Sequence, residues 1–206
     1  MKQVQVLKPP QIVAAEQFLD GPGPVPQFNV DVLRGRKVPA QKPGKSFQAY
    51  ETPAVFLDAV KKRFGVKSFS YDLAASNENT KGARWFTKEQ DSLAQDWAKL
   101  RGDCFLNPEF ADIAPWAEKC AASAWWEDAR AKHGGGPAGD RRIFFLVPAA
   151  VGSNWFQRHV FGKALVLLLN PRISFDGKAG FPKDLVLAVF GSKPGVECWR
   201  WQGKPL

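Results

Sequence analysis

Three continuous apolar runs constrain the fold of this chain more than any other feature. Residues 143–148, 164–169 and 185–190 contain no polar side chain. A strand with one solvated face alternates apolar and polar residues, so runs of this length indicate strands buried on both faces. Such strands need helices on both sides of their sheet, and we therefore predict a three-layer α/β fold.

The order of the expected elements also predicts how the sheet is connected. Helix and strand patterns alternate over the first two-thirds of the chain, and strand patterns then follow one another closely. Alternation is typical of parallel strands joined by helices, whereas close spacing is typical of antiparallel neighbours. We therefore expect a mixed sheet with an antiparallel pair at one edge.

Residues 52–131 supply the remaining elements. Thr52 is expected to cap a helix with Pro53 in its first turn, and Gly65 is expected to end that helix. Pro115 stands near the start of a second helical pattern, rich in alanine, tryptophan and glutamate. The expected strands are 69–72, 84–86 and 104–106, the second helix is 113–131, and 91–97 is expected to form a helical turn or loop.

Composition bounds the domain organisation and the class of partner. The 206 residues, 45% of them hydrophobic, suffice for one substantial core, which we place in residues 47–206. Residues 1–46 are punctuated by proline and glycine and carry a basic segment, so we expect an N-terminal extension. The net charge of +9 favours a polyanionic partner without identifying it, although a solvated basic surface without a partner is the alternative.

Several function classes lack support in the sequence. The three cysteines are far apart and the two histidines have no acidic or cysteine neighbours in a metal or triad pattern, so we expect no metal site. The chain opens without a signal-peptide pattern, and its longest apolar run is too short to span a bilayer. We therefore expect a soluble, cytoplasmic protein.

The segment Asn107-Pro108-Glu109-Phe110 carries the clearest chemical signal. It follows the apolar run 104–106, which places it at the end of a strand. An amide, a stiffening proline and an aromatic face together form a small clamp for a planar heterocycle with an exocyclic amine. The alternative for the Asn-Pro pair is an ordinary turn.

The order of motifs around this segment resembles the phage-type DNA N6-adenine methyltransferase (Dam) family over about 48–190. A Thr-Pro pair stands before a helix at 52–53, and a strand at 69–72 ends in an aspartate followed by small residues. An aromatic-Phe-Thr string then precedes Asp-x-Leu-x-x-Asp-Trp at 91–97. The Asn-Pro segment comes last, with Glu109 where the family usually has a second proline.

This resemblance implies a Rossmann-like fold dependent on S-adenosylmethionine (SAM) and methyl transfer to the exocyclic amine of adenine in DNA. The amide oxygen of Asn107 and the backbone carbonyl of Pro108 would accept the two amine hydrogens and aim the nitrogen lone pair at the methyl group. Phe110 would stack on a base that is flipped out of the duplex or already unpaired. Glu109 could face solvent, lie near the cofactor or weaken catalysis.

The resemblance also implies a set of cofactor-binding residues. Asp72 would meet the amino group of SAM, with small residues after it to allow close approach, and Asp91 would hold the adenine or ribose end. Each aspartate could instead cap a helix or turn. The implied cofactor-binding residues are Thr52, Pro53, Asp72, Ala74, Ala75, Ser76, Asp91 and Asp96.

Basic residues are candidates for holding DNA phosphates, which would offset the cost of extruding a base. Two further functions stay open: a non-catalytic DNA-binding homologue, in which Glu109 marks lost catalysis, and methylation of the exocyclic amine of cytosine. The family resemblance further implies a phage or prophage origin and protection of DNA from restriction. The candidate DNA-binding residues are Arg34, Arg36, Lys37, Arg141, Arg142 and Arg172.

Overall fold

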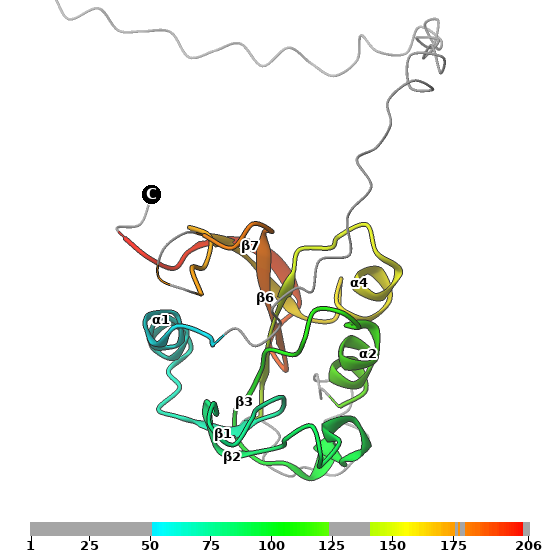
Figure 1. Ribbon diagram of the computed structural model, residues 1–206. Coiled ribbons are helices and arrows are strands. Elements are labelled where there is room, and N and C mark those ends of the chain that lie inside the picture. The colour runs from blue at the N-terminus through cyan, green and yellow to red at the C-terminus, as the bar shows by residue number, and fades with distance from the viewer. Residues whose placement is uncertain (1–50, 124–140, 176, 178–179, 204–206) are drawn as a thin grey trace, which may run out of the picture. The chain divides into compact units, whose positions relative to one another are not determined.

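A computed structural model describes residues 51–123, 141–175, 177 and 180–203 (Figure 1). The expected N-terminal extension, with Arg34, Arg36 and Lys37, lies outside the described residues. So does the second half of the helix expected at 113–131.

The core of the fold is a seven-stranded mixed sheet with the strand order β2-β1-β3-β4-β6-β5-β7. Strands β2, β1, β3 and β4 are mutually parallel, β6 is antiparallel to both of its neighbours, and β7 is parallel to β5. The strands are β1 Phe69–Asp72, β2 Gly82–Trp85, β3 Cys104–Leu106, β4 Ile143–Pro148, β5 Leu165–Asn170, β6 Leu185–Phe190 and β7 Gly195–Arg200.

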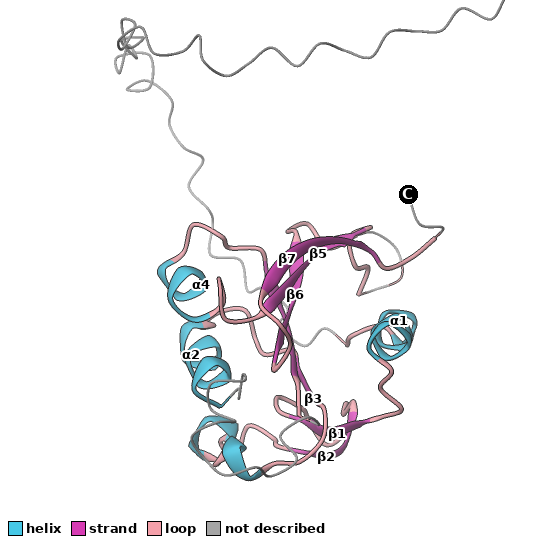
Figure 2. Cartoon of the chain, turned by 180° about the vertical axis from the view of Figure 1, so that it is seen from behind, coloured by secondary structure: helices cyan, strands magenta, loops and turns pink. Residues whose placement is uncertain are grey.

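Helices cover both faces of this sheet, as predicted (Figures 1 and 2). Helix α1 (Ala54–Phe64) lies on one face, and α2 (Ala114–Ser123) and α4 (Asn154–His159) lie on the other. Within β4, Phe145 and Val147 belong to the core cluster under α2 and α4, whereas Phe144 and Leu146 belong to the cluster under α1. This alternation explains why a strand buried on both faces has no polar position.

The prediction of an antiparallel pair at the sheet edge was wrong in its position. The antiparallel strand β6 lies inside the sheet, between β4 and β5. All six residues of β6 are buried, which requires a strand on each side as well as cover on each face. On that side the sheet ends at β7. The side chains of β7 are mostly exposed, so it has no apolar run that would predict it.

Three short helical elements complete the described part of the chain. The 3₁₀ turn η3 (Ser92–Ala94) lies within the segment 91–97 that was predicted as a helical turn or loop, and a second turn, η4 (Trp97–Lys99), begins at the last residue of that segment. Helix α4 was not predicted, and it begins after Ser153, whose hydroxyl accepts a hydrogen bond from the backbone N–H of Phe156. In the part of the chain that the structure describes, no helix combines the length and apolarity needed to cross a membrane.

Candidate functional site

A pocket of about 490 Å³ lies beyond the carboxyl ends of β1 and β3. Its walls come from the loop after β1, the segment that joins β2 to η3, the loop from β3 into α2, and Thr52. Parallel neighbouring strands end at the same edge of a sheet, so their following loops meet there. The topology therefore brings together side chains that are far apart in the sequence.

Three buried polar atoms give this pocket an unfilled hydrogen-bonding capacity. They are the Oδ1 atoms of Asn79 and Asn107 and the Oγ of Ser92, which have no hydrogen-bond partner. Among the described residues, no other buried side-chain nitrogen or oxygen atom lacks a hydrogen-bond partner. All three residues line the pocket. An unsatisfied buried polar group costs about 1–3 kcal/mol, so such a group is expected where a ligand satisfies it.

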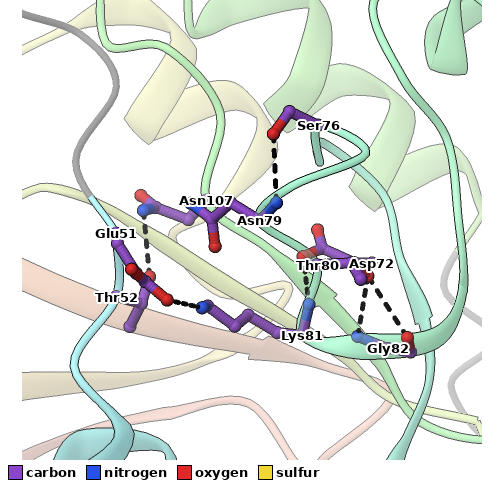
Figure 3. Close-up of polar contacts among 9 residues, drawn as sticks. All are labelled: Glu51, Thr52, Asp72, Ser76, Asn79, Thr80, Lys81, Gly82 and Asn107. Carbon is purple, nitrogen blue, oxygen red and sulfur yellow. Dashed lines mark hydrogen bonds and ion pairs between the residues drawn. The ribbon is translucent and has the colours of Figure 1, made fainter.

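Asn107 follows directly after β3, and its orientation is set by Thr52 (Figure 3). The amide Nδ2 donates to the Thr52 hydroxyl oxygen at 3.0 Å. This bond fixes which end of the amide faces Thr52 and leaves Oδ1 as an acceptor for a ligand. The predicted capping role of Thr52 was wrong, because Pro53 is at the N-cap position of α1 and no side chain caps the helix.

Asp72 ends β1 and is buried, with 4% of its surface exposed. Its carboxylate accepts hydrogen bonds from the backbone N–H groups of Ala74, at 3.2 Å, and of Lys81, at 2.8 Å. Burial raises the pKa of Asp72 above its ordinary value, although the two backbone bonds and the charge of Lys81 partly oppose that rise. A cationic ligand would stabilise the charged carboxylate and lower this pKa.

The pKa of Asp72 leads to a pH prediction for any cationic ligand of the pocket. Because the folded pKa is raised, Asp72 contributes stability to the ligand-free protein at low pH, and that contribution is lost as the pH rises through the raised value. Ligand affinity should change in the opposite sense and fall as the pH decreases through that value. Calorimetric titrations with SAM at pH values below and above the raised pKa of Asp72 test the prediction. It fails if the SAM affinity of an Asp72→Asn variant has the same pH dependence as that of the wild type.

Carboxylates outnumber ammonium groups around the pocket. Asp91, Glu109 and Asp112 line it together with Asp72, whereas its cationic lining residues are Lys81 and Lys88. Lys81 also forms an ion pair with Glu51 at 2.5 Å. This balance favours a ligand that carries positive charge over a polyphosphate.

The two aspartates predicted near the far end of the cofactor differ in position. Asp91 lines the pocket and has φ 44°, the one positive φ at a non-glycine residue in the described segments. A left-handed conformation at such a residue is strained and is often found at ligand sites. Asp96 is outside the lining residues, caps η4 by accepting from the Ala98 N–H at 3.0 Å, and pairs with Lys99. Asp96 therefore matches the capping alternative.

The other residues predicted to bind the cofactor or the substrate also fall into two groups, inside and outside the pocket lining. Thr52, Ala74, Ala75, Ser76 and Glu109 line the pocket. The lining does not include Pro53, buried Pro108 or Phe110, whose ring packs edge-on against Phe181 with centroids 5.8 Å apart.

Eleven of the lining residues were not predicted to contact a ligand, and Asn79, Lys81, Ser92 and Trp116 are among them. Asn79 and Lys81 follow the small residues after β1, so a closer reading of that loop would have included them. Nothing in the sequence marks Ser92, because its burial depends on the packing of Trp97, whose indole N–H donates to the Ser92 carbonyl at 2.9 Å.

Arg141 and Arg142 were predicted to bind DNA. They precede β4 and so lie at the amino ends of the parallel strands, whereas the pocket lies at the carboxyl ends. The Arg141 guanidinium donates to the carbonyl oxygens of Trp97, Leu100 and Ser123. Arg142 forms two hydrogen bonds with the Asp103 carboxylate, at 2.7 and 2.9 Å. Both guanidinium groups donate to protein acceptors, and we therefore propose that neither contacts DNA phosphates.

Replacing Arg141 should therefore affect stability and leave DNA binding intact. Arg141→Met leaves three carbonyl groups without this donor, and we expect the free energy of unfolding to fall by about 2 kcal/mol. Chemical denaturation measures this loss, with Arg158→Met on the exposed face of α4 as the matched control. A drop in DNA affinity without a loss of stability would contradict this assignment.

A match to a known protein family identifies the class of protein. The chain matches the family DNA N-6-adenine-methyltransferase (Dam) over residues 40–188, and it belongs to that family. This membership confirms the resemblance drawn from the motifs. No curated protein and no solved structure matches the chain.

Proposed function

We propose that this protein transfers a methyl group from SAM to the exocyclic amine of adenine in DNA, with residues 47–206 as its methyltransferase domain. The observation that carries the proposal is the unpaired amide oxygen of Asn107, in the same pocket as the buried carboxylate of Asp72. One group suits an amine substrate, and the other suits a cationic cofactor.

The residues of the pocket fit SAM. The volume of the pocket is within the range of small-molecule sites, and the excess of carboxylates in its lining complements a ligand with an ammonium and a sulfonium group. Asp72 would bind the ammonium group, while the unpaired atoms of Asn79 and Ser92, beside Asp91, would hydrogen-bond to the polar nucleoside end. When bound, SAM supplies a methyl group activated by its sulfonium.

The chain's own contribution to the chemistry is orientation of the target amine. The lone pair of an exocyclic amine is delocalised into the ring, so the amine is a poor nucleophile. The Asn107 Oδ1 and the Pro108 carbonyl would accept its two hydrogens and stabilise the charge that develops on nitrogen. Phe110 would stack on the base, and its contact with Phe181 would orient the ring.

A base within a duplex cannot reach such a pocket, so the target would be flipped out or unpaired. Arg172 follows β5 at the pocket edge of the sheet and is half exposed, with its guanidinium 2.7 Å from the carboxylate of Asp184. It therefore stays a candidate for phosphate contact, together with Arg34, Arg36 and Lys37.

Glu109 distinguishes this chain from the usual motif. It is exposed and lines the pocket, so its carboxylate has access to water and adds to the negative charge there. Exposure avoids the energetic cost of burying an unpaired charge. We therefore favour retained catalysis over a non-catalytic DNA-binding role.

Two measurements with purified protein test the proposal. Calorimetry should detect SAM binding, and methyl-labelled SAM should transfer its label to unmethylated DNA. Binding without transfer would support the non-catalytic alternative, and the absence of both would refute the proposed activity.

A further inference from the structure

Lys81 contacts both the pocket carboxylate of Asp72 and Glu51, the residue before the pocket-lining Thr52 (Figure 3). Its backbone N–H donates to Asp72 Oδ2 at 2.8 Å, and its Nζ lies 2.5 Å from Glu51 Oε1. Glu51 precedes Thr52, whose hydroxyl accepts from the Asn107 amide. A connected set of contacts therefore runs from the proposed cofactor carboxylate to the proposed catalytic amide.

The backbone from which Lys81 extends is held firmly. In the preceding loop, the Asn79 N–H donates to the Ser76 hydroxyl at 3.1 Å, and the Gly82 N–H donates to the Thr80 hydroxyl at 3.3 Å. The Lys81 side chain is itself 14% exposed, so its stem packs against protein and its ammonium has few alternative positions. A long side chain loses less entropy on pairing when it is already confined in this way.

We propose that Lys81 is a positioning residue, which fixes the Asn107 amide relative to the Asp72 carboxylate by joining the loop after β1 to the segment before α1. The ion pair with Glu51 holds the chain at Thr52, and Thr52 holds the amide with Oδ1 toward the ligand. The catalytic consequence of this role rests on the proposed methyltransferase function. Lys81 itself contacts neither substrate nor cofactor in this role.

Lys81→Met tests the role because it keeps the packed stem and the backbone N–H but removes the ammonium. We expect kcat to fall about fivefold, the effect of losing one favourable ion pair, with the KM for SAM and for DNA nearly unchanged. Glu51→Gln should give the same loss. Lys61→Met, which removes a lysine paired with Asp58 within α1 and outside the pocket lining, should leave kcat unchanged.

Two further variants separate positioning through Thr52 from other roles. In a Thr52→Val background the bond to Asn107 is already absent, so Lys81→Met should add little to the loss of kcat. The exchange of Lys81→Glu with Glu51→Lys should recover part of the activity lost in Lys81→Glu alone. A raised KM for DNA in Lys81→Met, with Glu51→Gln unaffected, would instead show direct phosphate binding and overturn the proposal.

A readout independent of activity keeps this proposal distinct from the proposed function. The side-chain amide signals of Asn107 can be assigned in NMR spectra by comparison with Asn107→Ala. They should shift or broaden in Lys81→Met and in Glu51→Gln, but not in Lys61→Met. If the wild type methylates nothing and these signals still respond, the function fails and the positioning role stands; signals that do not respond refute the positioning role.

Discussion

Asn107→Ala should reduce methyl transfer to DNA by about 10²–10³-fold, the loss measured when one preorganised hydrogen-bonding group is removed from an active site. The substitution deletes the unpaired Oδ1 acceptor and the donor to Thr52. The fold should tolerate it, because a buried unsatisfied oxygen is removed together with a single hydrogen bond, and these effects on the free energy of unfolding oppose each other. Initial rates with methyl-labelled SAM measure the loss.

Controls distinguish a catalytic loss from unfolding. Asn154→Ala replaces an exposed asparagine at the start of α4 and should keep full activity and stability. SAM affinity should change little in Asn107→Ala, because the proposed cofactor contacts lie elsewhere in the pocket. Activity near the wild-type level in the folded variant would remove Asn107 from the mechanism.

Gly82→Ala should lower the free energy of unfolding by about 3 kcal/mol, because a side chain there has no space. A Cβ atom would lie 2.4 Å from the Asp72 nitrogen and from the Tyr71 carbonyl carbon, and 2.8 Å from the Arg84 carbonyl oxygen. These are backbone atoms, so no rotamer change relieves the overlap. The start of β2 must move away from β1, which also displaces the Lys81 N–H from Asp72.

A second glycine offers a matched comparison for this effect. Gly195 begins the edge strand β7 as Gly82 begins β2, and an added Cβ would lie 3.7 Å from Leu165 Cδ1, an ordinary contact. Gly195→Ala should therefore be neutral or slightly stabilising. Thermal and chemical denaturation of both variants, with SAM titrations of Gly82→Ala, measure the difference. Equal stability of the two variants would contradict the argument from close backbone approach.

The sequence predicted the strands of the sheet better than their arrangement. β1, β3, β4 and β6 have the predicted bounds, because apolar runs bounded by turn residues determine local structure. The insertion of β6 between β4 and β5 depends on long-range pairing, which no local pattern encodes. Strand β7 was missed because its side chains are mostly exposed.

The site was predictable where strand topology determines it. Asp72 is the last residue of β1, and Asn107 directly follows its parallel neighbour β3. Because parallel neighbours end at the same edge of a sheet, the strand pattern places both residues there without knowledge of side-chain contacts. The side-chain contacts of Lys81 were not predictable, although its place in the loop after β1 was, because its hydrogen bonds to Asp72 and Glu51 span 9 and 30 residues of sequence. Arg141 was predicted to bind DNA from its charge alone, and its hydrogen bonds to backbone carbonyl groups could not be read from the sequence.

The identity of the methylated base tests the central claim most directly. Unmethylated DNA should be incubated with the protein and methyl-labelled SAM, digested to nucleosides and analysed by mass spectrometry. We predict label in N6-methyldeoxyadenosine with the wild type and its loss with Asn107→Ala. Label found only in N4-methyldeoxycytidine, or no labelled nucleoside from a wild type that binds SAM, would contradict the account of this pocket.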